Sequence, residues 1–539
     1  MKQTLFSSSF CQLLFSYIIV FSFVTVVLSL SPEDEKSGDI NWWCDITPHP
    51  EPCKYLMNRD TERFKKPKNR AEFRTMCIQV ALDQAIGTQC DTKELGSFCK
   101  KNQKRKTAWN DCDKLVDDTV FQLNNTLHGL QSIINFTTSD AQTWLSTALT
   151  NIETCRSGSI ELNVSDFLSP IHSRTNLTKL LSNSLDVNGG LEEDDREDQV
   201  NGYPSWITGK DRKLLETATA SVKANVIVST DGSGQFKSVQ AAINFAVSKR
   251  AKNQRVVIYI KKGIYKENIA ITNTMDKVTL IGDGLKYTVI TGSRSVAAGF
   301  TTYSSATVGV DGIGFIARGI TFQNRAGPEK GQAVALRSAS DLSVFYSCGF
   351  EGYQDTLFVH VQRQFYKSCK IYGTIDFIFG NAAVVFQDSV IYVRRPLRGQ
   401  PNVITAQGRS DPYQNTGICI HNCRIIPAPD LKPVVNSYKT YLGRPWQQYS
   451  RTVILKSNLD SFVHPTGWLT WLNTNFALNT LYYGEYQNNG EGASTTNRVK
   501  WPGYHVITNA NVASQFSVAN FIAGNAWLPS TGVKFTADL

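Results

Sequence analysis

The strongest constraint on the fold is a segment that repeats itself after 21 residues. Residues 348–358 (CGFEGYQDTLF) align with residues 369–379 (CKIYGTIDFIF), with cysteine, aspartate and phenylalanine at matching positions. Short β-branched runs on both sides, such as residues 255–260 (RVVIYI), are separated by Gly, Asp and Asn turns. A period near 20 residues is typical of coils that stack on one another. We therefore predict an all-β, right-handed parallel β-helix over residues 224–539.

The preceding 150 residues have a different periodicity. In residues 141–153 (AQTWLSTALTNIE), apolar side chains recur at three- and four-residue spacing, which is typical of amphipathic helices. We predict an all-α helix bundle over residues 38–188, since 539 residues exceed what one core usually supports. The acidic segment that follows lacks aromatics, so residues 189–223 are predicted to be a linker.

The N-terminus predicts export. Lys2 precedes an apolar run over residues 13–30, and the charged residues 31–35 (SPEDE) follow. This is the pattern of a secretory signal at residues 1–29, with cleavage after Ser29. An uncleaved signal anchor is the alternative, because the run approaches the length of a membrane span. No second apolar run of that length occurs, so the rest of the chain is predicted to be soluble.

Cysteines and sequons agree with a secreted protein. The 12 cysteines match no zinc spacing, so disulfides are expected rather than a metal site, and no cofactor is predicted. Cys44 and Cys53 enclose a turn-rich stretch, and Cys112 and Cys155 lie in helical segments that a disulfide could join. The pairing of seven others stays open: Cys77, Cys90, Cys99, Cys348, Cys369, Cys419 and Cys423. Glycosylation is predicted at four sequons, all in the N-terminal part: Asn124, Asn135, Asn163 and Asn176.

Charge is distributed unevenly along the chain. From Leu214 onward there are 32 Lys and Arg against 18 Asp and Glu, a net charge of +14, whereas the preceding residues carry a net −4. A basic half beside an acidic one predicts a polyanionic substrate and a complementary neighbour, although a solvated basic surface is the alternative. Nucleic acid is not predicted as a partner, because basic helices, zinc-finger spacing and RNA-binding aromatic motifs are missing from the sequence.

The repeat places two carboxylates together. Asp355 and Asp376 occupy the same position of successive coils, so their backbones would lie about 5 Å apart. Two carboxylates at close range cannot easily both ionise, so one tends to keep its proton while the other stays charged. The pair therefore predicts an acid and a nucleophile. The alternative is that each aspartate caps backbone amides in a turn.

Further motifs resemble known families. Residues 263–267 (GIYKE), 332–336 (QAVAL), 354–357 (QDTL), 376–380 (DFIFG) and 442–446 (LGRPW) occur in the order found in pectin methylesterases. That resemblance spans residues 225–530. The close and distant cysteine pairs, with residues 109–112 (WNDC) and 148–155 (ALTNIETC), resemble the pectin methylesterase inhibitor family. The chain as a whole resembles a two-part plant pectinesterase precursor.

The resemblance assigns roles to five residues. It makes Asp376 the nucleophile and Asp355 the proton donor that later acts as base. Gln354 and Gln332 would donate hydrogen bonds to the developing oxyanion. Arg444 would pair with Asp376, orient it and lower its pKa.

The resemblance also assigns substrate binding, and the implied substrate is methyl-esterified homogalacturonan of the plant cell wall. It places Gln332 and Arg444 in the site, with Phe300 and Thr302 at the rim of the groove. Sugars usually stack on aromatic faces, so Trp446, which belongs to a matched motif, and also Trp468 and Tyr353 are candidate walls of the groove. For any single aromatic residue, packing in the core is the alternative. A family cysteine is replaced here by Ser389, so its bridge to the position of Cys369 cannot form.

Processing and rival functions complete the hypothesis. Arg212 and Lys213 resemble the site at which a protease separates the two parts of such precursors, although Asp211 could simply cap a helix. A glycosidase or lyase on the same scaffold, a non-enzymatic inhibitor and a serine esterase are the rivals. The N-terminal part could inhibit its own enzyme, assist its folding or delay its activity until secretion.

Overall fold

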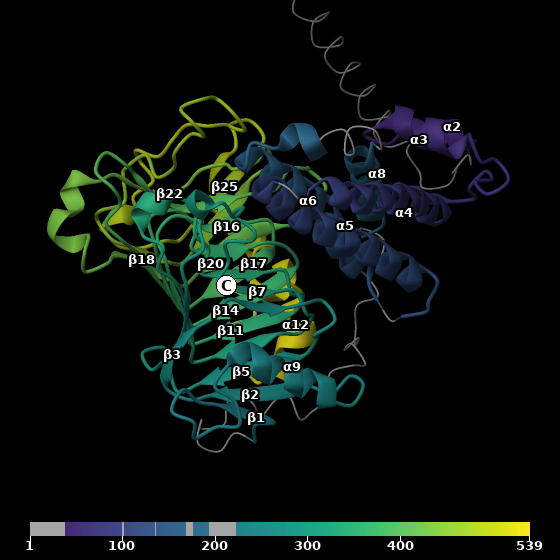
Figure 1. The fold of residues 1–539 in the computed structure, drawn as a ribbon. Helices are drawn as coiled ribbons and strands as arrows, with labels where there is room; N and C mark the ends of the chain where they lie inside the picture. Colours follow the sequence, from purple (N-terminus) through teal and green to yellow (C-terminus); the bar gives the residue numbers. More distant parts are fainter. Residues whose placement is uncertain (1–37, 100–101, 135, 169–175, 193–222) are drawn as a thin grey trace, which may run out of the picture.

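The computed structural model describes residues 38–99, 102–134, 136–168, 176–192 and 223–539 (Figure 1). The predicted signal, Asn135 and the dibasic pair at residues 212–213 lie outside these ranges. Figure 1 shows a helical region, coloured purple to blue, beside a coiled stack of strands coloured teal to yellow.

The helical region is built around a single apolar core. Phe73, Leu123, Leu145 and Leu181 are buried in it. Among the described residues, no helix is both long and apolar enough to cross a membrane. The helices of this region are α2 (Ile40–Asp45), α3 (Pro50–Met57), α4 (Arg70–Leu95), α5 (Gln103–Leu130), α6 (Thr138–Glu161) and α8 (Leu177–Glu192).

Two disulfides each join a pair of helices. Cys44 in α2 is bonded to Cys53 in α3, and Cys112 in α5 is bonded to Cys155 in α6. Helix α6 begins with a capping box, in which the side chains of Thr137 and Asp140 satisfy each other's backbone amides. These contacts fix the helix that faces the strands.

Helix α8 extends further than the sequence predicts. The expected linker starts at residue 189, but α8 continues to Glu192. The reason is Asn188, whose fully buried side-chain amide donates to the Thr138 carbonyl (3.1 Å) and to Gln142 Oε1 (2.7 Å). These hydrogen bonds hold the helix against α6, so the following glycines do not end it.

The strands form three parallel sheets, as predicted. Each coil contributes strands to the sheets in turn, and every pairing between the strands of these sheets is parallel. The repeat is visible in the register, since Leu336, Leu357 and Ile378 pair at steps of 21 residues. A parallel sheet wound in this way is a β-helix.

Among the described residues, the sheets contain 11, 7 and 8 strands. The first contains β1 (Val226–Val228), β2 (Val256–Ile260), β5 (Val278–Gly282), β8 (Ile316–Arg318), β11 (Ser343–Tyr346), β14 (Arg363–Lys367), β17 (Ala383–Gln387), β20 (Gly417–His421), β23 (Arg451–Leu455), β25 (Tyr482–Tyr486) and β26 (Tyr504–Val506). The second contains β4 (Ile269–Ile271), β7 (Val308–Val310), β10 (Leu336–Ser338), β13 (Leu357–Val359), β16 (Ile375–Gly380), β19 (Asn402–Gln407) and β22 (Thr440–Gly443). The third contains β3 (Gly263–Lys266), β6 (Thr288–Gly292), β9 (Thr321–Asn324), β12 (Gly349–Glu351), β15 (Lys370–Gly373), β18 (Val390–Val393), β21 (Arg424–Pro427) and β24 (Asn458–Leu459).

Aromatic side chains stack in the buried interior of the coils. Phe345, Tyr366 and Phe386 are buried one above another, with ring centroids 4.6 and 4.7 Å apart. Helix α9 (Val239–Lys249) packs against the first coils, and α10 (Ala510–Ser514), α11 (Val518–Phe521) and α12 (Gly524–Trp527) pack on the outer face of the 11-stranded sheet. This stack is a rigid support for side chains on its surface.

Candidate active site

The aspartates Asp355 and Asp376 lie at the same position of consecutive coils. Asp355 lies two residues before Leu357, and Asp376 lies two residues before Ile378. Leu357 and Ile378 are paired in register. Both have left-handed backbone conformations, with φ of 59° and 50°, which aspartate adopts more readily than most residues. Strand β16 also carries a bulge between Ile375 and Ile378, so the ladder is interrupted at Asp376. The fold thus displays two neighbouring carboxylates at a local irregularity.

Arg444 holds one of the two carboxylates. It follows strand β22 directly, and its Nε donates to Asp376 Oδ1 at 2.8 Å while a second guanidinium nitrogen donates to Oδ2. The side chain of Asp376 is 8% exposed and that of Arg444 is 18% exposed. Two hydrogen bonds from one guanidinium, at a buried position, fix the carboxylate in one orientation.

Burial and charge separate the two aspartates electrostatically. The pKa of Asp355 is raised well above its usual value by burial, by the charge of Asp376 and by that of Glu161. The pKa of Asp376 is raised by burial, and Arg444 opposes the rise. Arg444 thus lowers the Asp376 pKa, as the sequence predicts, but burial outweighs that contribution in the assembled chain. These shifts favour ionisation of Asp376 before Asp355.

Two glutamines lie beside the pair. Gln354 directly precedes Asp355, and its carbonyl accepts from the amide of Ala333, which follows Gln332. Both glutamines are half-buried. Among the described residues, neither side-chain amide donates a hydrogen bond to the protein, so both remain available to a negative charge.

Trp446 lies in an aromatic group on the same surface. Its ring meets Phe358 and Phe379 edge-on, at centroid distances of 6.4 and 5.9 Å. Phe358 and Phe379 are paired in register and stack at 4.4 Å. The repeat places these two phenylalanines three residues after the two aspartates, at the last matching position of the aligned segments.

The other predicted aromatic residues lie differently. Trp468 is 1% exposed, its ring stacks on Tyr483 at 4.2 Å, and its indole nitrogen donates to Glu485 at 3.2 Å. It is a core residue here and not a groove wall. The Tyr353 ring is covered by Arg394 at 3.8 Å, and the Phe300 ring lies beneath Arg294 at 4.9 Å.

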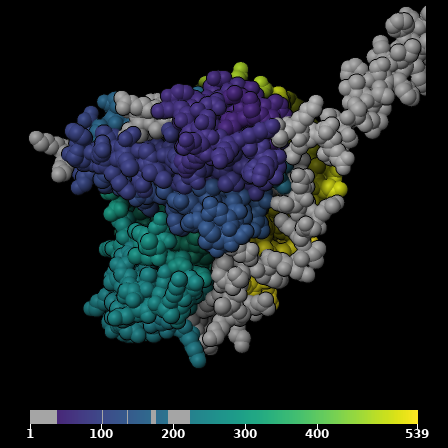
Figure 2. Space-filling model, turned by 90° about the vertical axis from the view of Figure 1, so that its right-hand side faces the viewer, coloured from purple at the N-terminus to yellow at the C-terminus, as the bar shows by residue number. Residues whose placement is uncertain are grey.

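The helical region lies over this surface (Figure 2). The amide of Thr302 donates to Glu161 Oε2 at 2.8 Å, so this residue, predicted to bind substrate, is occupied by α6. Lys114 of α5 forms an ion pair with Asp311 at 2.5 Å. A Cβ placed on Gly158 of α6 would lie 3.6 Å from the Cβ of Thr301, so helix and coil touch closely there.

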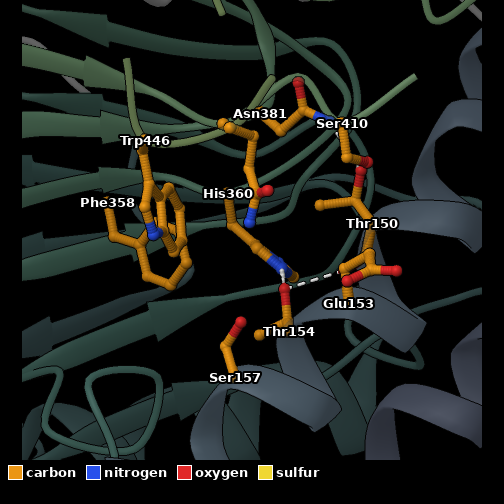
Figure 3. Close-up of a pocket in the computed structure, with 11 residues that line it drawn as sticks. Thr150, Glu153, Thr154, Ser157, Phe358, His360, Asn381, Ser410 and Trp446 are labelled. Carbon is orange, nitrogen blue, oxygen red and sulfur yellow. Dashed lines mark hydrogen bonds between the residues drawn. The ribbon is translucent and has the colours of Figure 1, made fainter. Parts of the chain in front are cut away.

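A small cavity remains between α6 and the coils (Figure 3). Figure 3 shows Trp446 and Phe358 on one side and the α6 residues Glu153, Thr154 and Ser157 on another. Thr154 Oγ1 is hydrogen-bonded to His360 Nε2 at 2.8 Å. His360 is a site residue that the sequence analysis missed.

The repeat contains the signal for His360. Asn381 lies 21 residues after it, so the two stand five residues beyond Asp355 and Asp376. The Asn381 amide nitrogen donates to Thr150 Oγ1 of α6 at 2.8 Å. Both members of this repeated pair therefore contact the helical region.

Other predicted sites have mixed surroundings. Asn163 and Asn176 are exposed, whereas Asn124 is half-buried in α5 and its side chain donates to the Val120 carbonyl at 3.0 Å.

Ser389 accepts from the Cys369 amide at 3.0 Å. Within the described residues, no group of three or more His, Cys, Asp or Glu side chains could hold a metal ion. Seven cysteines in the described ranges are free thiols: Cys77, Cys90, Cys99, Cys348, Cys369, Cys419 and Cys423.

Comparison with known proteins accounts for both regions. The family model described as Pectinesterase matches residues 225–525, and that described as Plant invertase/pectin methylesterase inhibitor matches residues 38–187. The "Probable pectinesterase/pectinesterase inhibitor 59" of Arabidopsis thaliana is 52% identical over 538 residues, covering 98% of each chain. "Pectinesterase 2" of Citrus sinensis is 52% identical over 523 residues, covering 97% of this chain and 98% of its own.

The strand region also matches a solved structure. The pectin methylesterase from carrot is 52% identical, with a TM-score of 0.57, and the match covers 59% of this chain and 99% of the carrot chain. A chain of the length of the strand region therefore forms this fold without the helices. The chain belongs to the pectinesterase family, and its pectinesterase region is preceded by a region of the pectin methylesterase inhibitor family.

Proposed function

We propose that residues 225–539 hydrolyse the methyl esters of galacturonate in homogalacturonan by aspartyl catalysis. The products are methanol and free carboxylates on the polymer. One observation carries the assignment of roles: Asp355 and Asp376 lie at matching positions of consecutive coils, and the Arg444 guanidinium donates hydrogen bonds to Asp376 and not to Asp355. This asymmetry favours a protonated Asp355 and an ionised Asp376.

In the first half of the reaction, the Asp376 carboxylate attacks the carbonyl carbon of the ester. The side-chain amides of Gln332 and Gln354 donate to the oxyanion that forms. Asp355 gives its proton to the departing methoxide, so methanol leaves and an anhydride remains on Asp376.

In the second half, the ionised Asp355 takes a proton from water, and the hydroxide attacks the same carbonyl carbon. The bond to the Asp376 oxygen breaks, which frees the galacturonic acid group and restores the Asp376 carboxylate. Asp355 is again protonated. The product acid then ionises in solvent, and the cycle balances.

A polysaccharide-cleaving function is the second candidate. Two close carboxylates also suit a retaining glycosidase. The free amides of Gln332 and Gln354 favour the esterase, because an acyl transfer needs donors to an oxyanion and glycosidic cleavage does not.

We further propose that the helical region blocks the groove of its own chain. Three contacts support this: Glu161 occupies the Thr302 amide, Thr154 is bonded to His360, and Lys114 is paired with Asp311. A polymer chain cannot lie on this surface while α6 does. In this proposal the chain is exported to the plant cell wall, carries glycans on the helical region, and is cut near Arg212 and Lys213.

The test is methanol release from highly methylated pectin. We would compare purified residues 225–539, the same region with Asp376→Asn, and the full chain, and follow polymer length in parallel. The proposal predicts methanol from the unmodified region alone, with unchanged polymer length. Shortened polymer, or full activity of Asp376→Asn, would contradict it.

A further inference from the structure

The guanidinium of Arg444 needs support beyond its ion pair. Its side chain has several rotatable bonds, and it follows the last residue of β22, where the strand ends. An arginine in this place could turn towards water and leave Asp376 uncompensated. Its exposed fraction is only 18%, so another group covers part of it.

That group is Trp471. The Arg444 guanidinium carbon lies 4.6 Å from the centroid of the Trp471 ring, within the range of a cation–π contact. The Trp471 ring is half-buried. The guanidinium thus has the Asp376 carboxylate as a hydrogen-bond partner and an aromatic ring as a packing partner.

The backbone ties the loop that carries Trp471 to the strand end that carries Arg444. Gly443, which precedes Arg444, forms a parallel bridge with Trp468, and the Leu469 amide donates to the Gly443 carbonyl at 3.0 Å. The Trp471 carbonyl accepts from both the amide (3.0 Å) and the hydroxyl (2.7 Å) of Thr474. The loop is therefore tied to the strand that carries the arginine.

We propose that Trp471 is a positioning residue, which acts through Arg444 to keep the Asp376 carboxylate ionised and aimed at the ester. The proposal deepens the proposed esterase function and rests on it. Trp471 differs in this from Trp446, whose ring lines the cavity and contacts other aromatic rings.

Three variants of the released β-helix region test this role. Trp471→Leu removes the aromatic ring, Trp471→Phe keeps a smaller ring, and Leu472→Ala changes an exposed neighbour (71% exposed) on the same loop. We would measure kcat and KM for methanol release across pH, together with the thermal unfolding midpoint. Unmodified protein, assayed beside them, establishes that the esterase itself is active.

For Trp471→Leu we expect kcat to fall about 3- to 30-fold, the range of one cation–π contact, with KM changed less than twofold. The acid limb of kcat/KM should move to higher pH, since Arg444 opposes the rise in the Asp376 pKa. Trp471→Phe should recover most of the activity, and Leu472→Ala should match the unmodified protein.

A raised KM with an unshifted pH profile would overturn the proposal and make Trp471 a sugar-stacking residue. A fall in kcat without a shift of the acid limb, or no recovery in Trp471→Phe, would also overturn it. If Trp471→Leu fails to fold, Trp471→Phe decides. The acid limb of its kcat/KM profile should lie at a slightly higher pH than that of the unmodified protein. An inactive unmodified protein would instead contradict the proposed esterase function.

Discussion

The two regions of this chain hold their functional side chains in place by different means. In the β-helix, the backbone register fixes Asp355 and Asp376 at one position of adjacent coils. In the helical region, α6 is aligned with the groove by side-chain contacts to residues more than 100 positions away, such as those of Thr154 and Glu161. Catalytic geometry is thus built into the backbone, whereas coverage of the groove depends on an interface.

That interface differs in character from either core. Its contacts include many polar ones, among them Gln142 with the Tyr413 carbonyl and Ser146 with Asn415. A small apolar cluster, with Leu115, Tyr303 and Phe379, crosses between the regions. The main cores are separate, since one contains only residues 40–187 and the other only residues from 226 onward. Polar interfaces between independent cores are the kind that open.

The largest effect should come from the backbone-fixed pair. Asp376→Asn replaces the nucleophile by an amide of the same shape, so kcat of the β-helix region should fall at least about 1,000-fold. Methanol release measures this, and an unchanged circular dichroism spectrum would show that the fold is kept. Residual activity within tenfold of the unmodified protein would show that Asp376 is not the nucleophile.

A smaller loss is expected at the oxyanion donors. Gln354→Ala removes one amide, and loss of one such donor typically costs about 100- to 1,000-fold in kcat. The KM for pectin should change little, because the amide acts on charge that develops in the transition state. A variant whose KM rises while kcat holds would show that Gln354 binds sugar instead.

A larger side chain between α6 and the β-helix should open the interface between the two regions. Gly158 faces Thr301 so closely that Gly158→Phe has no room, and overpacking of about 1–3 kcal/mol corresponds to a roughly 5- to 150-fold shift towards the open chain. The full-length variant should therefore release methanol where the unmodified full chain does not. Gly87→Phe, placed on α4 where nothing lies within 4 Å, is the matched control and should stay silent.

The weakest effect is that of pH. Burial raises the pKa of Asp111 to about 6, and it also raises the pKa values of Asp118, Glu153 and Glu161. A carboxylate whose pKa is raised when the helical region lies on the β-helix takes up a proton as that region docks. Docking of the helical region on the β-helix is therefore favoured at low pH, and it weakens as pH rises towards 6, the raised pKa of Asp111.

Binding of the separated helical region to the β-helix region, measured by calorimetry between pH 4.5 and 7, checks this sign. Asp111→Asn should flatten the dependence. Tighter binding at higher pH would contradict it, and would assign control to the ion pair of Lys114 with Asp311 instead.

Much of the β-helix could be predicted from the sequence, because a 21-residue repeat translates directly into stacked coils. The same repeat placed Asp355 beside Asp376 and matched Phe358 with Phe379, and extending it by two residues would have matched His360 with Asn381. Trp468 could not be placed in this way, since it lies outside the repeat and only the structure shows it to be buried against Tyr483.

The position of the helical region could not be predicted at all. Helical periodicity indicates which face of α6 is apolar, but Thr150 and Thr154 reach the groove from a polar stretch that resembles a solvated surface. The burial that raises the Asp376 pKa could not be predicted for the same reason, because it depends on contacts that the sequence does not reveal. Contacts between distant segments decide both.

The most direct test of the account is to lock the interface. Gly158→Cys with Thr301→Cys brings two Cβ atoms to about 3.6 Å, within the usual range for a disulfide. With a protease site inserted in residues 193–222 and cut, we would assay methanol release before and after mild reduction, beside cut unmodified protein treated identically. The oxidised protein should release no methanol, and reduction should restore the rate of the control. Equal rates in the oxidised and reduced protein would show that α6 does not cover the working site.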